Sequence, residues 1–177
     1  MSATLWLWLV LSVIAGTSTS SSARSGSYKV TVNPARCGTL SAAQQEWLSP
    51  EWRPYLDYTR ICPVRNAKRE IVLWLVSVHA DLYYRAQPGA SAAIIKLPNP
   101  LLLRSSGEVL GSLPYNFPDD PPAELRVTFA AWDRDFPRKI ELFLTDPRAS
   151  GDRSLPPLLW DDIKKKYAST KDTPHGR

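Results

Sequence analysis

The chain has few of the residues on which most catalytic sites depend. Its 177 residues include only two histidines, two cysteines and eight glycines. The glycines are scattered, so the chain has no glycine-rich loop that would cradle a phosphate group. A zinc site needs several Cys or His ligands, and two histidines are too few once the cysteines pair with each other. We therefore expect no enzyme activity, no cofactor and no bound metal.

One pair of residues leaves a small hydrolase as the least favoured alternative. His79 and Asp81 lie two positions apart, so on a strand they share a face and can pair as a base with its orienting carboxylate. No serine lies in a Gly-x-Ser-x-Gly elbow that would supply the nucleophile. Calcium binding is also disfavoured, because Asp is common in turns for backbone reasons; the turn aspartates are Asp119, Asp120, Asp133, Asp135, Asp146 and Asp152.

A short apolar run near the start of the chain predicts export. Residues 5–15 (LWLWLVLSVIA) are followed by a Ser/Thr tract. The run is shorter than the roughly 20 apolar residues of a membrane-spanning helix, and it matches the apolar core of a secretory signal peptide. Small residues at Ser21 and Ala23 favour cleavage after Ala23, so residues 1–23 are the expected signal peptide. The alternative is an uncleaved membrane anchor or a buried N-terminal element. The expected location is periplasmic or secreted.

Export changes what is expected of the two cysteines. In an oxidising compartment, Cys37 and Cys62 are expected to form a disulfide bond. Closing that loop would stabilise the fold by about 3 kcal/mol through the entropy of the unfolded chain. A nucleophilic thiol is the alternative, but it needs a histidine partner. The chain has only His79 and His175, and His175 lies in the polar C-terminal tail. The disulfide is the preferred interpretation.

Alternating apolar and polar residues predict a mainly β protein. The expected strands are residues 28–32, 70–80, 92–97, 101–103, 108–110, 125–131 and 140–144. The strand over 70–80 is almost continuously apolar, so we expect it to be covered on both faces. The clearest hairpin has its turn at 133–135 and places Leu125, Val127, Phe129 and Ala131 on one face. These patterns favour an antiparallel β-sandwich or an open barrel.

Helices are expected in two places. Two short segments lie between the cysteines, one opened by a Ser41–Gln44 capping box and the other beginning at Ser49. A C-terminal amphipathic helix is expected over residues 158–167, where apolar residues recur at helical spacing: Leu159, Ile163 and Tyr167.

The chain is expected to form one domain. Cleavage would leave about 154 residues, which is enough for a single hydrophobic core. Residues 24–167 are the expected β-rich domain, with a proline-rich connector at 114–122. Residues 168–177 are the expected disordered tail.

Six aromatic residues are candidate binding residues: Trp47, Trp52, Tyr55, Tyr58, Trp132 and Trp160. The first four lie between the cysteines, where they form either a stacking platform for a sugar or peptide, or core packing beneath a disulfide-tied cap. Core packing is the preferred interpretation for these four. For a protein interface, the candidate anchors are Trp132, Trp160 and the Trp47/Trp52 pair, because Trp contributes strongly to interface energetics.

The charge balance suggests an acidic partner. The chain carries 22 Lys and Arg against 17 Asp and Glu, a formal net charge of +5. Outside the cytosol this surplus favours an acidic protein or an anionic envelope polymer over nucleic acid. Lys164, Lys165 and Lys166 form a compact positive run that either contacts an anionic membrane surface or is the solvated face of the last helix.

These features lead to one preferred function and one main alternative. The preferred function is a non-enzymatic exported protein that docks on another protein, of the inhibitor, immunity or secretion-accessory type. The alternative is a module that binds a glycan or another envelope polymer through Trp52, Tyr55 and Tyr58.

Overall fold

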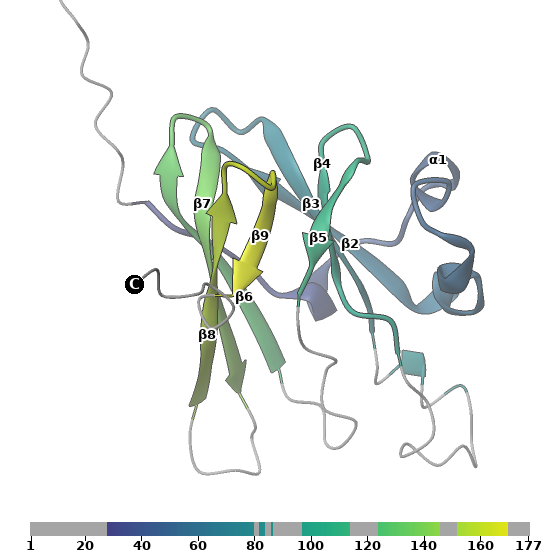
Figure 1. The fold of residues 1–177 in the computed structure, drawn as a ribbon. Coiled ribbons are helices and arrows are strands. Elements are labelled where there is room, and N and C mark those ends of the chain that lie inside the picture. Colours follow the sequence, from purple (N-terminus) through teal and green to yellow (C-terminus); the bar gives the residue numbers. More distant parts are fainter. Residues whose placement is uncertain are drawn as a thin grey trace, which may run out of the picture.

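Two antiparallel sheets form the fold in the computed structural model, which describes residues 28–79, 82–83, 86, 97–113, 124–145 and 152–169 (Figure 1). One sheet has the strand order β1-β6-β7-β8-β9, and the other has the order β2-β3-β4-β5. The strands are β1 (Val30–Val32), β2 (Thr59–Arg65), β3 (Ile71–Val78), β4 (Leu101–Arg104), β5 (Val109–Ser112), β6 (Glu124–Asp133), β7 (Phe136–Thr145), β8 (Asp152–Asp161) and β9 (Lys166–Ser169). The expectation of a mainly β protein is confirmed, and a β-sandwich describes the arrangement.

The β6–β7 hairpin follows the predicted alternation with one exception. Leu125, Val127 and Phe129 are buried in the core between the sheets, as expected. Ala131 is exposed and has a φ of 51°, so its inclusion on the buried face was wrong. The left-handed backbone at Ala131 shifts the alternation, and Trp132 becomes buried in its place.

Strand β3 is covered on both faces, as its apolar run predicted. Leu73 and Leu75 belong to the core between the sheets. Val76 and Val78 belong to a second cluster, which also contains the fully buried Trp52. An apolar strand suits this position, because both faces are packed over most of its length.

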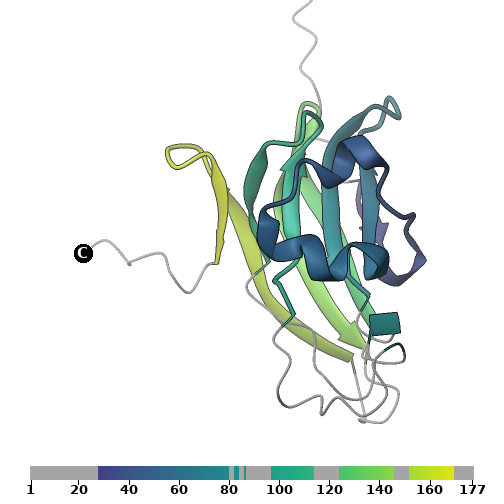
Figure 2. The same ribbon diagram turned by 90° about the vertical axis from the view of Figure 1, so that its right-hand side faces the viewer.

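The segment between the cysteines covers the outer face of the β2-β3-β4-β5 sheet (Figure 2). It follows η1 (Pro34–Arg36) and contains α1 (Ala42–Gln45) and η2 (Pro50–Tyr58). The capping box at the start of α1 is confirmed, since Ser41 and Gln44 bond each other's backbone amides. The Cys37–Cys62 disulfide is also confirmed, and it ties the end of η1 to β2.

The expectation of a helix over residues 158–167 was wrong. These residues form the end of β8, a turn and β9, with Trp160 opposite Tyr167. Ile163 would have been buried by the helix, but its side chain is 94% exposed. The Asp161 carboxylate accepts hydrogen bonds from the next backbone amides, which favours a turn over a helix. Strand β9 continues to Ser169, two residues past the expected end of the domain.

Strand β2 was not predicted. Its Pro63 and two arginines interrupt the alternation, but β2 is the outermost strand of its sheet, where proline is tolerated. The expected signal segment 1–23, most of the 92–97 strand, the 114–122 connector and the tail from 170 lie outside the described residues. Among the residues that are described, no helix is long and apolar enough to cross a bilayer.

Candidate functional site at the hairpin end

Four hairpin turns gather at one end of the sandwich, which we call the hairpin end (Figures 1 and 2). The turns are residues 66–70 between β2 and β3, 105–108 between β4 and β5, 134–135 between β6 and β7, and 162–165 between β8 and β9. Each hairpin joins strands that are adjacent in one sheet, so its turn stays close to its own strands. The hairpin end therefore brings together residues that lie far apart in the sequence.

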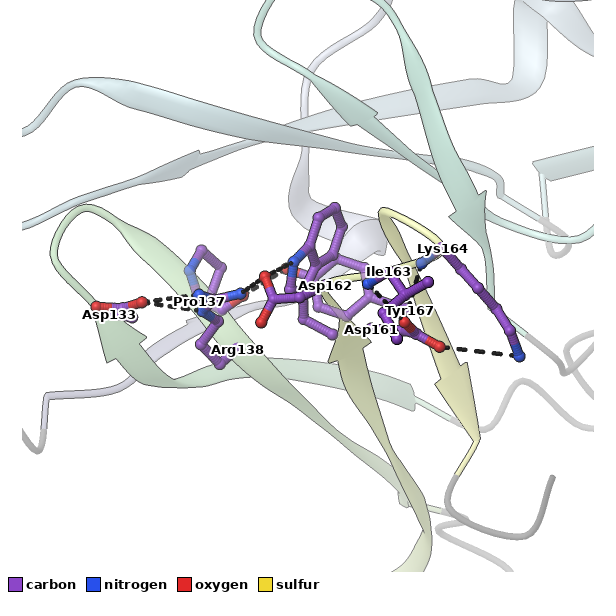
Figure 3. Close-up of polar contacts among 9 residues, drawn as sticks. Asp133, Pro137, Arg138, Asp161, Asp162, Ile163, Lys164 and Tyr167 are labelled. Carbon is purple, nitrogen blue, oxygen red and sulfur yellow. Dashed lines mark hydrogen bonds and ion pairs between the residues drawn. The ribbon is translucent and has the colours of Figure 1, made fainter. Parts of the chain in front are cut away.

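Ion pairs connect three of these hairpins. Lys68 of the β2–β3 turn contacts Asp135 of the β6–β7 turn at 2.8 Å. Arg138 of β7 contacts Asp133 at 2.8 Å and Asp162 of the β8–β9 turn at 2.6 Å (Figure 3). Arg138 holds the pKa of Asp162 below its usual value, and both carboxylates raise the pKa of Arg138. Solvent screens these exposed pairs, so their main effect is to position the turns relative to one another.

The β8–β9 turn is held by its own polar contacts and presents one apolar side chain. The Asp161 carboxylate accepts bonds of 2.9 Å from the backbone amides of Ile163 and Lys164, and these bonds lower the pKa of Asp161 (Figure 3). The indole N–H of Trp160 donates to Asp162 at 3.1 Å. Ile163 is fixed between these anchored residues with its side chain in solvent. An exposed aliphatic side chain on an ordered turn is a natural contact residue.

A small cleft of about 200 Å³ lies beside this turn, lined by Arg104, Asp133, Phe136, Arg138 and Trp160. Its aromatic floor is rigid, because the Phe136 and Trp160 rings pack edge to face at 4.8 Å, and Tyr167 packs against both. The Tyr167 hydroxyl donates to the backbone carbonyl of Pro137 at 2.6 Å, and burial raises the pKa of Tyr167. Trp160, a predicted anchor, is therefore half-buried at the hairpin end.

Two other predicted anchors, Trp132 and Trp52, are buried instead. The Trp132 side chain is 1% exposed, stacks on Tyr28 at 4.7 Å and donates its indole N–H to the carbonyl of Phe129. Trp52 is also 1% exposed. Neither ring can contact a partner without local unfolding.

The remaining aromatic candidates pack on the outer face of the second sheet. Trp47 packs against Trp74, with ring centroids 6.2 Å apart. Tyr55 and Tyr58 both contact Tyr83, at 5.3 and 5.2 Å. All three candidates are half-buried, so they leave partial surfaces rather than one open stacking platform.

A groove of about 420 Å³ lies beside Tyr55, lined by Glu51, Trp52, Tyr55, Leu97, Pro98, Asn99, Leu101 and Ser112. It combines one partly exposed aromatic ring with a carboxylate, an amide and a hydroxyl. Groups of this kind suit a sugar, whose apolar faces stack on rings and whose hydroxyls bond polar side chains.

The small-hydrolase alternative depends on His79 and Asp81. The Nδ1 atom of His79 accepts from the backbone amide of Leu82, and its own backbone amide donates to Tyr58. These contacts give His79 a role in ending β3, while its expected partner Asp81 lies outside the described residues.

Several carboxylates of the described residues pair with cations. Glu141 binds Lys29 and Lys139, which lower the pKa of its carboxyl group. Glu108 binds Arg104. Within the described part of the chain, no group of three or more His, Cys, Asp or Glu side chains is placed to hold a metal ion.

No protein-family model, no curated protein and no solved structure matches this chain. The proposal for the hairpin end therefore rests on its own geometry. Lys164, Lys165 and Lys166 were predicted on a helix, but they lie in and beside the β8–β9 turn and are exposed. Ile163 and Arg138 were not predicted as site residues. The two consecutive aspartates before Ile163 were the available turn signal, because Asp favours turns.

Proposed function

We propose that this protein is an exported, non-enzymatic binding domain that docks on another protein through its hairpin end. The disulfide indicates a location outside the reducing cytosol, and the apolar run at residues 5–15 supports a periplasmic or secreted protein. An inhibitor, an immunity protein or a secretion accessory would act by docking of this kind.

The observation that carries the proposal is the β8–β9 turn. Ile163 is 94% exposed, yet the turn that presents it is fixed by four polar contacts: two amide bonds to Asp161, the indole bond to Asp162 and the Arg138–Asp162 ion pair. A turn that is already ordered loses little backbone entropy on binding, so a residue on it suits a partner contact. The adjacent lysines add the positive charge expected to attract an acidic partner.

A capture experiment with matched variants tests this proposal. Immobilised wild-type protein, Ile163→Ser and Leu159→Ser are incubated with the exported protein fraction of the native host, and retained proteins are quantified by mass spectrometry. Leu159 is 45% exposed on β8 and serves as the control for removing a surface aliphatic residue. We expect Ile163→Ser alone to lower retention of the partner about tenfold or more, as for loss of an interface anchor. Equal retention by all three proteins would refute the proposal.

The groove beside Tyr55 supports a second candidate, binding of a neutral or weakly charged glycan. Tyr55 is the better test residue than Trp52, because Trp52 is buried and its replacement would damage the fold. If this candidate holds, retention on polysaccharide columns falls in Tyr55→Ala and is unchanged in Ile163→Ser.

A further inference from the structure

Three hairpin turns place a cation in the left-handed backbone region. Arg69 has a φ of 68° between β2 and β3, Arg134 a φ of 55° between β6 and β7, and Lys165 a φ of 52° between β8 and β9. Among the described residues, only one other non-glycine residue, Ala131, has a positive φ. Glycine or asparagine normally occupies such positions, because a Cβ atom is crowded there. The backbone conformation of these turns therefore does not explain why Arg or Lys occupies the three positions.

The three cations differ from Lys68 and Arg138, two other cations of the hairpin end. Lys68 and Arg138 hold the turns together through carboxylates of neighbouring hairpins. Arg69, Arg134 and Lys165 form no ion pair with any residue in the described parts of the chain. Lys165 attracts the Asp162 carboxylate only at longer range, as one of the charges that lower its pKa. The three cations can therefore still contact a partner, while the turns that carry them are fixed.

The turns that carry these cations are neighbours. The Lys68–Asp135 contact joins the Arg69 turn to the Arg134 turn, and the Arg138–Asp162 contact joins the β6–β7 hairpin to the turn with Lys165. Ile163 belongs to the same end of the sandwich. Strained backbone that positions polar groups on one surface is typical of functional sites.

We propose that the hairpin end binds an acidic face of a partner protein, with Arg69, Arg134 and Lys165 contacting its carboxylates around the anchor Ile163. This inference rests on the proposed docking function and names the chemistry of the partner. The net charge of +5 adds long-range attraction to such a face.

A protein fits this surface better than a uniform polyanion such as a sulfated polysaccharide or an anionic bilayer. Six carboxylates share the hairpin end with the cations: Glu70, Glu108, Asp133, Asp135, Asp161 and Asp162. Five of them pair with cations of the chain, so the surface carries positive and negative groups side by side. A protein can meet such a mixed pattern with complementary charges, whereas a uniform polyanion cannot. The exposed Ile163 adds an apolar contact that a polysaccharide would not need.

The test compares three triple variants that lose the same charge. The first replaces Arg69, Arg134 and Lys165 with glycine, and the second replaces them with glutamine. The control variant carries Arg36→Gln, Arg53→Gln and Arg60→Gln, three positions in η1, η2 and the start of β2. Binding is measured by calorimetry against the purified protein that the wild type retains in the capture experiment. Heparin-column elution measures binding to a uniform polyanion, and thermal unfolding measures stability.

We expect both turn variants to weaken partner binding about thirtyfold or more and the control to weaken it less than threefold. The glycine variant should unfold at a temperature equal to or above that of the wild type and above that of the glutamine variant, because glycine relieves the left-handed strain. Heparin elution should fall equally in all three variants, because it follows net charge.

Other outcomes separate this inference from the function on which it rests. If the turn variants bind like the control while Ile163→Ser still loses binding, docking stands and the role of the cations is refuted. If Ile163→Ser also binds normally, both fail. Heparin affinity lost only in the turn variants, with partner binding intact, would overturn the inference in favour of a polyanion site. A glycine variant that unfolds below the glutamine variant would refute the argument from strain.

Discussion

Reduction of the Cys37–Cys62 bond should remove a large part of the stability of the fold. The bond links residues 25 positions apart in the sequence. Cross-linking a loop of that length restricts the unfolded chain and contributes about 3.5 kcal/mol in the chain-entropy model. A domain of this size is stable by only about 5–15 kcal/mol, so the loss is a substantial fraction of the total.

The structure also indicates where the loss appears first. The segment between the cysteines contains only α1 and η2 before β2 begins, and it is held to the sheet mainly by Trp52, Leu40 and the Gly38–Ile61 bridge. In contrast, β6 and β7 pair along almost their full length. After reduction, amide protection should therefore fall over residues 38–58 before it falls in the β6–β7 hairpin.

Urea unfolding of oxidised and reduced protein, with hydrogen exchange, provides the assay. For a slope of about 2 kcal/mol per molar urea, the midpoint should fall by about 1–2 M on reduction. The double variant Cys37→Ala/Cys62→Ala is the control, because added reductant should not change its midpoint. A difference below about 1 kcal/mol between oxidised and reduced protein would refute the loop-entropy reasoning, and unchanged exchange over residues 38–58 would refute the local prediction.

Elements whose local pattern agrees with their packing were predictable from the sequence. The β6–β7 hairpin combines period-two alternation with an Asp-rich turn, and both features follow from one buried face. The continuous apolar run of β3 predicted cover on both faces. The core between the sheets covers one face, and the disulfide-tied insert covers the other. The capping box of α1 could be predicted because it depends on only two residues three positions apart, Ser41 and Gln44.

The C-terminal region could not be assigned from periodicity alone. Leu159, Ile163 and Tyr167 match helical spacing, but only Tyr167 is buried. The same residues also fit the period of two of a strand. Leu158 is buried and Trp160 is partly buried, and both belong to β8. When a short segment fits both periods, the elements that pack against it determine its secondary structure. Here β7 pairs with the segment, which therefore forms a strand.

The hairpin end could not be predicted from the sequence for two physical reasons. Its residues come from four hairpins, so only the strand order of both sheets brings them together. The left-handed turns are occupied by Arg69, Arg134 and Lys165, residue types that give no turn signal. Only the positively charged run after Ile163 was visible, and the helix prediction gave it the wrong context.

Two further predictions test the packing and the turn. Gly107→Ala should destabilise the fold by about 2–3 kcal/mol in urea unfolding, because its φ is 91° and a Cβ atom would come within 2.6 Å of the Trp47 ring. Gly38→Ala is the matched control, since no atom lies within 4 Å of its Cβ position, and an equal loss in both variants would contradict the packing argument. The pKa of Asp161 is lowered by amide hydrogen bonds, so these bonds should persist above about pH 5 and be lost as the pH falls below about 4. The chemical shift of the Lys164 amide proton should therefore titrate with a midpoint below the usual Asp value of about 3.9, and Asp161→Asn should abolish that titration. A midpoint at or above the usual value would mean that the carboxylate does not hold the turn in solution.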